Sequence, residues 1–106
     1  MPPMYTAGTW TVTEENAESF VAAWTAFAEW TLDNFEGCTF AKLTRDREHP
    51  ERFFSFGPWS GPEAVAAWQG HPGWQERIGT VRDLAENVAI HALDVASEVG
   101  AATPDP

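Results

Sequence analysis

Three histidines and one cysteine are the side chains of this sequence best suited to proton transfer or nucleophilic attack near neutral pH. His49 lies in a stretch of charged residues and is typical of a solvated turn. His71 separates two predicted helices beside Trp68 and Trp74, whereas His91 lies in an apolar stretch near the C-terminal end. We predict that His71, or as a second choice His91, accepts a proton at a ligand pocket. The alternatives are structural: a helix cap or surface residue for His71, and a residue satisfied in the core or a dimer interface for His91.

Metal and cofactor motifs are absent from the sequence. The spacing of the histidines gives no metal-ligand pattern, and a single cysteine excludes an internal disulfide and a cysteine-rich zinc site. No glycine-rich nucleotide loop, P-loop, HExxH, GxSxG or calcium-binding loop occurs. We therefore expect no cofactor and no metal, and we interpret Cys38 as a small buried hydrophobic residue.

Aromatic residues are the unusual feature of the composition, with six Trp, seven Phe and one Tyr in 106 residues. Each indole offers a flat apolar surface and one N–H donor, which suits a pocket for a planar ligand. The residues predicted to wall such a pocket are Trp24, Phe27, Trp59, Trp68 and Trp74. The N–H of Trp59 or Trp68 would then donate to a substrate oxygen, while Trp10 and Trp30 are weaker candidates. The alternative is ordinary helix-on-sheet packing, in which these rings fill the core.

Charge and hydropathy restrict the partners. Six Lys and Arg are outnumbered by sixteen Asp and Glu, and the formal net charge of −10 disfavours nucleic acids and anionic membranes. The sequence lacks a run of about 18 apolar residues and the basic and apolar segments of a secretory signal. We therefore expect a cytoplasmic protein with one domain over 1–106, its core in about 5–99 and a tail over 100–106.

The spacing of apolar residues predicts the order β-α-β-β-α-α-β. The predicted strands are 5–13, 38–45, 52–59 and 87–99, and the predicted helices run from a Thr13 cap to about 35, over 63–69, and from near 72. We expect Gly37 to end the first helix, and Ser60 with Glu63 to form a capping box before the second. Four strands with helices in these places form a ferredoxin-like α+β fold with a four-stranded antiparallel sheet.

One sheet face should pack on the helices, yet both faces of two predicted strands are apolar. Phe53 and Trp59 point one way in the third strand, and Phe54 and Phe56 point the other. The last strand shows the same mixture, with Val88, Ile90 and Ala92 opposing Ala89, His91, Leu93 and Val95. A second apolar face needs a cover, so we predict a homodimer packed sheet to sheet.

Several segments together resemble a known family. They are Gly37-Cys38-Thr39-Phe40, Arg45-Asp46 with Pro50-Glu51-Arg52-Phe53, and Trp59-Ser60 with Glu63-Ala64. Over about 5–99 the chain resembles the antibiotic biosynthesis monooxygenase family, which implies a dimeric α+β barrel of two ferredoxin-like subunits. The family contains cofactor-free oxygenases, haem-degrading enzymes and members without known activity.

The chain departs from the family pattern in three places. In haem-degrading relatives a His follows the Trp equivalent to Trp68 ten positions later, but the residue here is Ile78. Those relatives also use an Asn in the first strand, and 5–11 contains none. The end of the third strand, often charged in the family, is the uncharged stretch 56–59.

Three functions follow from the residues and the resemblance. The first is a cofactor-independent monooxygenase acting with dioxygen on a polycyclic aromatic or quinol-type small molecule, whose anion itself supplies electrons to oxygen. The alternative is a non-catalytic module that binds an apolar or aromatic small molecule. Haem binding or degradation ranks last because of the departures at Ile78 and in the first strand.

Overall fold

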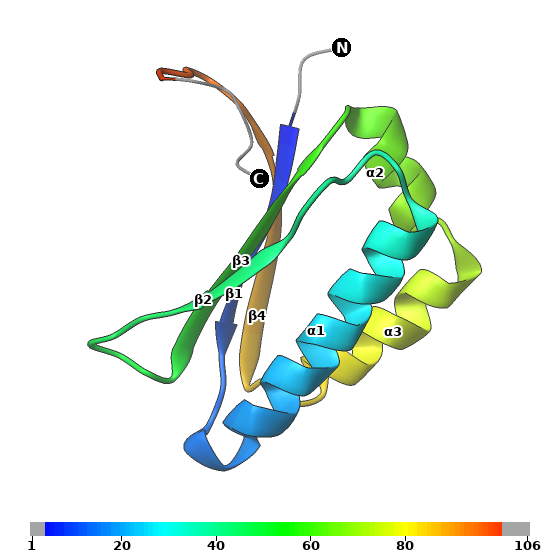
Figure 1. The fold of residues 1–106 in the computed structure, drawn as a ribbon. Coiled ribbons are helices and arrows are strands. Elements are labelled where there is room, and N and C mark those ends of the chain that lie inside the picture. The colour runs from blue at the N-terminus through cyan, green and yellow to red at the C-terminus, as the bar shows by residue number, and fades with distance from the viewer. Residues whose placement is uncertain (1–3, 101–106) are drawn as a thin grey trace.

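The chain forms one antiparallel sheet covered on one side by helices (Figure 1). The computed structural model describes residues 4–100. The elements in chain order are β1 (Met4–Thr11), the 3₁₀ turn η1 (Glu14–Asn16), α1 (Ala17–Asn34), β2 (Lys42–Arg45), β3 (Arg52–Trp59), α2 (Pro62–Gln69), α3 (Pro72–Arg82) and β4 (Asn87–Asp94). This order confirms the predicted β-α-β-β-α-α-β arrangement and the ferredoxin-like α+β fold. Most of the predicted tail, 101–106, lies outside the described residues.

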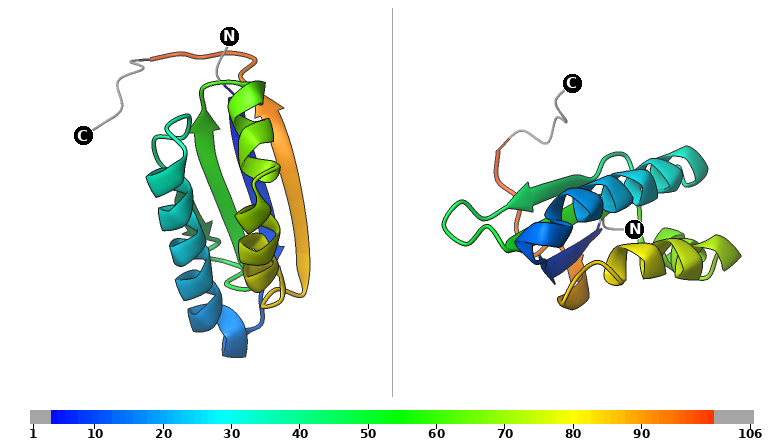
Figure 2. Two further views of the ribbon diagram at one scale, coloured as in Figure 1. Left: turned by 90° about the vertical axis from the view of Figure 1, so that its right-hand side faces the viewer. Right: turned by 90° about the horizontal axis from the view of Figure 1, so that it is seen from below.

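The sheet has the strand order β2-β3-β1-β4, with every neighbouring pair antiparallel. In its register, Gly8 of β1 pairs with Ser55 on one side and with Ile90 on the other. All three helices lie against the same side of the sheet (Figure 2). We call this side the inner face, and the other side the open face.

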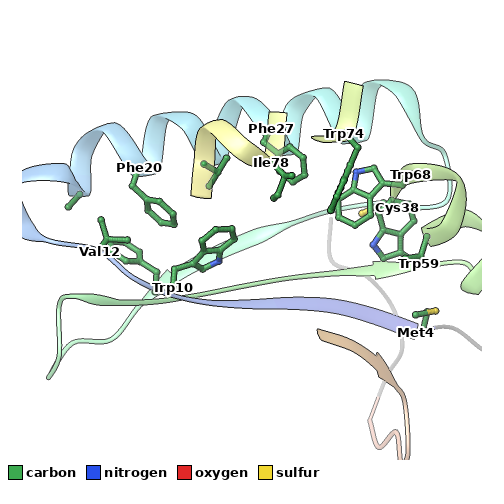
Figure 3. Close-up of a cluster of buried hydrophobic side chains, with 14 residues drawn as sticks. Met4, Trp10, Val12, Phe20, Phe27, Cys38, Trp59, Trp68, Trp74 and Ile78 are labelled. Carbon is green, nitrogen blue, oxygen red and sulfur yellow. The ribbon is translucent and has the colours of Figure 1, made fainter. Parts of the chain in front are cut away.

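The inner face carries the core. Phe20, Val12 and Val81 are fully buried, and the Phe20 ring lies 5.3 Å from Trp10 and 5.0 Å from Phe53 between ring centroids. The apolar stripe expected on α1 faces this layer, because Phe20, Phe27 and Thr31 are buried and Trp24 is half-buried. Figure 3 shows the Trp59, Trp68 and Trp74 rings gathered at one end of the layer and Phe20 at the other.

The open face keeps large apolar side chains exposed. Phe54 is 41 % exposed and Leu93 is 46 % exposed, whereas Phe53 and Trp59 of β3 are each 2 % exposed. The alternation predicted for the third strand is therefore present. In the described part of the chain, no helix is both long enough and apolar enough to cross a membrane.

The end of α1 agrees with its prediction to within one residue, whereas the role expected of Gly37 and the expected start of β2 differ from the structure. Helix α1 stops at Asn34 because Phe35 is already extended, with φ −136° and ψ 106°. Gly37, expected to end the helix, instead permits a close approach: a Cβ there would lie 2.7 Å from the Cβ of Ala64. The ladder of β2 begins only at Lys42, and Cys38 makes an isolated bridge to Trp59.

Two further predictions are corrected at α2 and β4. The N-cap of α2 is Gly61 and no side chain caps it, so the expected capping box of Ser60 and Glu63 does not form. Strand β4 ends at Asp94 because that residue pairs with Met4, the first residue of β1. Beyond Asp94 there is no described partner strand to continue the ladder.

Candidate functional site

A cavity lies between the inner face of the sheet and the helices. It has an empty volume of about 530 Å³, part of which is open to solvent, and its exposed wall is overwhelmingly apolar. The lining consists of Thr6, Ala7, Gly8 and Trp10 from β1, Trp24, Phe27, Ala28 and Thr31 from α1, Cys38 and Ala41 from the next segment, Ser55, Phe56, Gly57 and Trp59 from β3, and Trp68, Ile78 and Ile90 from α2, α3 and β4. Nearly every element of the fold therefore contributes to one site.

Four of the five aromatic residues predicted to wall a pocket lie in this lining: Trp24, Phe27, Trp59 and Trp68. The fifth, Trp74, lies behind it with its ring edge-on to Trp68, the centroids 5.8 Å apart. Trp74 is 9 % exposed and its buried Nε1 has no partner among the described residues. Whether these rings bind a ligand stays a prediction.

Three indole N–H groups around the cavity are already engaged by hydroxyls, each at 3.0 Å. Trp10 donates to Ser55, Trp59 donates to Thr6, and Trp68 donates to Thr31. The suggestion that the indole of Trp59 or Trp68 donates to a substrate oxygen therefore does not fit this geometry. An indole has one donor, and in both residues it is already used.

Neither histidine predicted to act on the substrate lines the cavity. His71 is exposed and caps α3, since its Nδ1 accepts from the backbone N–H of Gly73 at 2.9 Å. His91 follows the cavity residue Ile90 in β4, so it points from the open face, with the sheet between it and the cavity. The cap was the structural alternative for His71, and the catalytic roles of both residues stay predictions.

None of the described residues that line the cavity has a side chain that is charged at neutral pH. The one ionisable group among them is Cys38, which is buried, and burial raises the pKa of the thiol. The Cys38 Sγ lies 3.3 Å from the Phe40 carbonyl oxygen, to which it donates. The described residues hold no group of three His, Cys, Asp or Glu side chains that could bind a metal ion. The described side chains that line the cavity therefore supply hydrogen-bonding groups that are neutral at pH 7.

The interior of the cavity is narrow. The centre of a water molecule has about 60 Å³ in which to move, compared with about 150 Å³ in a cavity that holds one benzene ring. Trp59 and Trp68 pack against each other at one end, with ring centroids 4.7 Å apart. A ligand with fused rings therefore needs half-buried side chains, such as Trp24, to move outward when it enters.

Small polar and glycine residues of the lining were not predicted as site residues. Thr6, Gly8, Ser55 and Gly57 come from β1 and β3 and lie on the inner face. Their signal was available, because glycines and hydroxyls at inward positions of a strand leave space that a large apolar residue would fill. Without the register, no pattern showed that these four positions are adjacent.

Comparisons with solved structures support the fold and agree on the same architecture. The cofactor-independent oxygenase SnoaB from Streptomyces nogalater superposes with a TM-score of 0.82 at 16 % identity, covering 93 % of this chain and 98 % of SnoaB. A proposed antibiotic biosynthesis monooxygenase from Deinococcus radiodurans gives 0.79 at 19 % identity, covering 94 % and 99 %. Rv0793 from Mycobacterium tuberculosis gives 0.77 at 17 % identity, covering 92 % and 99 %.

Comparison of the sequence identifies the family, which the structural likeness at this low identity does not. No curated protein matches it significantly. Residues 3–78, which are most of the chain, match the model of one family, and the predicted resemblance is thereby confirmed. The chain belongs to the antibiotic biosynthesis monooxygenase family.

Proposed function

We propose that this protein is a cofactor-independent monooxygenase that oxidises a flat aromatic molecule, polycyclic or quinol-type, with dioxygen. The observation that carries the proposal is the apolar cavity, walled by indole and phenyl rings and free of charged side chains, in a chain of this family. Flat rings offer stacking surfaces to a planar ligand. The structural likeness to SnoaB, itself described as a cofactor-independent oxygenase, supports the reaction class.

The reaction class needs little from the protein beyond a dry, shaped space. A ring system with an acidic CH₂ group loses a proton, and the resulting carbanion reduces dioxygen by one electron. The two radicals combine to a peroxide anion, which takes up the proton released in the first step and then loses water, so that R₂CH₂ + O₂ gives R₂C=O + H₂O. An apolar wall excludes bulk water, and fixed hydrogen-bond donors stabilise the anion.

The partners that we propose are the small aromatic substrate, dioxygen and a second copy of the chain. The exposed apolar side chains of the open face, Phe54 and Leu93 among them, support sheet-to-sheet pairing because a lone sheet would leave them in water. The family resemblance points to the same dimeric α+β barrel. Such pairing would cover the face on which His91 lies.

The test is oxygen uptake with anthrone as substrate, in protein treated with a chelator. We expect one O₂ consumed per anthrone converted to the quinone. The variant Ala28→Leu places a larger side chain in the cavity wall on α1, and we expect it to lower kcat/KM at least tenfold by filling the space. Ala26→Leu adds the same side chain at an exposed position of α1 and should retain the rate.

Uptake that is absent in the wild type, or equal in Ala28→Leu and Ala26→Leu, would reject oxidation in this cavity. A non-catalytic binding module is then the second candidate. One observation favours it: among the described residues that line the cavity, the only ionisable group is Cys38, and burial raises the pKa of its thiol, so this wall supplies no anionic base. Saturable quenching of tryptophan fluorescence by anthrone without product would support binding alone.

A further inference from the structure

Two hydroxyl groups in the cavity wall have a proton that no protein acceptor uses. Ser55 accepts the indole N–H of Trp10, and Thr6 accepts that of Trp59, each at 3.0 Å. Among the described residues, neither hydroxyl donates to a protein oxygen. Ser55 is only 9 % exposed, and both residues line the cavity. Thr6 is half-buried. A buried donor without an acceptor costs stability, so the proton of Ser55, and to a lesser degree that of Thr6, has reason to point to a guest in the cavity.

Thr31 provides the contrast within the same wall. It accepts the indole N–H of Trp68 at 3.0 Å, as the other two hydroxyls accept theirs. Its own proton, however, goes to the backbone carbonyl of Phe27 at 2.9 Å. Thr31 is therefore satisfied in both directions, whereas Ser55 and Thr6 are satisfied only as acceptors.

The position of the two hydroxyls suits a shared ligand. In the register of β1 and β3, Gly8 pairs with Ser55 and Thr6 pairs with Gly57, so the hydroxyls lie one diagonal step apart on the inner face. A Cβ on Gly8 would lie 2.8 Å from both the Ser55 Oγ and the Trp10 Nε1, so glycine at this position leaves room for the bond between them. The accepted indole bond also polarises each hydroxyl and makes it a stronger donor.

We propose that Ser55 and Thr6 orient the ligand of this cavity by donating to its oxygens, and that the ligand is therefore a ketone, quinone or phenolate rather than a plain aromatic hydrocarbon. The proposal rests on the proposed function in that the ligand occupies the same cavity. It adds which side chains bind the ligand, Ser55 and Thr6, and which ligand atoms accept their hydrogen bonds, the oxygens. The indoles of Trp10 and Trp59 act indirectly, because they orient and polarise the hydroxyls to which they donate.

The experiment measures the affinities of 1-indanone and indane by equilibrium dialysis. The two compounds have the same carbon skeleton and differ by one carbonyl oxygen. We expect the wild-type protein to bind the ketone more tightly. We expect Ser55→Ala and Thr6→Val each to reduce the ketone-to-hydrocarbon affinity ratio by about threefold to tenfold, the range of one lost hydrogen bond. Thr25→Val makes the same change at an exposed position of α1 that does not line the cavity, and it should leave the ratio unchanged to within about twofold.

Trp10→Phe is the second control, since it breaks the same Trp10–Ser55 bond but keeps the Ser55 hydroxyl. It should reduce the ketone preference by less than Ser55→Ala does, because the hydroxyl that donates to the ligand is still present. If the effect of Ser55→Ala came only from the lost bond and packing, both variants would reduce the preference equally. If Ser55→Ala does not fold, Thr6→Val with Trp59→Phe provides the same comparison at the other pair.

If the folded variants keep the ketone-to-hydrocarbon affinity ratio of the wild type, the proposal about Ser55 and Thr6 is wrong. If the wild type still binds indane in that case, the cavity remains a ligand site. Failure of both probes to bind the wild type would overturn the proposal together with a ligand role for the cavity. If the ketone preference depends on the hydroxyls but the protein takes up no oxygen, the result supports the roles of Ser55 and Thr6. It then counts only against the proposed oxygenase function.

Discussion

Each buried indole in this protein needs an acceptor for its N–H, because an unpaired donor in an apolar interior costs about 1–3 kcal/mol. Trp10, Trp59 and Trp68 find hydroxyls at 3.0 Å, and these hydroxyls form the polar part of the cavity. Trp74 does not find one among the described residues. At the scale of single residues, the buried indole N–H groups need hydrogen-bond acceptors, and this need accounts for the Ser and Thr side chains in an otherwise apolar cavity wall.

The variant Thr31→Val tests this requirement without changing the shape of the side chain. Thr31 is 3 % exposed, and its loss leaves the buried Nε1 of Trp68 without an acceptor. We expect the free energy of unfolding to fall by about 1–3 kcal/mol, measured by urea denaturation. Thr25→Val is the control, because Thr25 also bonds a helix carbonyl of α1, at 2.7 Å, but is exposed. Its effect should stay within about 0.5 kcal/mol, and equal losses in both variants would contradict this account.

The elements are held at their ends by local polar contacts. In the turn between β2 and β3, the Asp46 carboxylate accepts from the backbone N–H groups of Glu48 and His49 at 2.8 and 3.1 Å. At the start of α3, His71 accepts from Gly73. These contacts determine where the chain reverses and where a helix begins, and both can be tested by single substitutions.

The backbone N–H of Glu48, and after it that of His49, holds the pKa of Asp46 below its ordinary value. Because the folded pKa is lowered, this carboxylate stabilises the fold above the pKa that it has in the unfolded chain, and the contribution is lost as the pH falls through the folded value. We expect Asp46→Ala to lower the urea midpoint at pH 7, with the difference from wild type shrinking in acid. Glu48→Ala removes the same charge from the same turn but no such acceptor, so a matching pH-dependent loss there would contradict the argument.

His71 allows its cap to be separated from a role in proton transfer. We expect His71→Ala to lower the free energy of unfolding by about 0.5–2 kcal/mol through loss of the N-cap, and His71→Asn to restore it, because Asn is a favoured cap. Turnover of anthrone by the stable Asn variant then decides the catalytic prediction. Lost turnover would support His71 as the proton acceptor, and retained turnover would leave it with the structural role alone.

At the scale of the whole molecule, the sheet has helices on one side only (Figure 2). The open face exposes Phe54 and Leu93, whereas the side chains between sheet and helices are buried. Within residues 4–100, which the structure describes, no further helix or strand covers this face. The proposed homodimer would bury it by pairing two identical surfaces, as a two-fold axis requires.

Phe54→Lys places a charge on the open face and should shift the protein from dimer toward monomer, measured by sedimentation velocity. We expect the sedimentation coefficient of the variant to depend on protein concentration in a range where that of the wild type does not. Val21→Lys introduces the same charge on α1, where Val21 is 40 % exposed, close to the 41 % of Phe54. We expect it to leave the association state unchanged. A monomeric wild type, or an equal shift in both variants, would contradict pairing through the open face.

How far the sequence could predict the fold depended on the range of the interactions involved. The periodicity of apolar residues identified all four strands and three helices, and β3 agrees with its predicted range, because amphipathic patterns act over neighbouring residues. Element ends were predicted less well. The capping box at Ser60 failed, and Gly37 proved to be a packing position, because both depend on what the tertiary fold brings nearby.

The sequence by itself determined which aromatic side chains share a face, since the spacing along α1 gathers Phe20, Trp24 and Phe27 on one stripe and the alternation along β3 puts Phe53 and Trp59 opposite Phe54. It did not determine which polar groups meet them. Trp10 and Ser55 are 45 positions apart, and Thr6 and Trp59 are 53 apart, so only the register of β1 on β3 makes them partners. That pairing is a property of the folded sheet, and it decided that hydroxyls rather than indole N–H groups or histidines face the cavity.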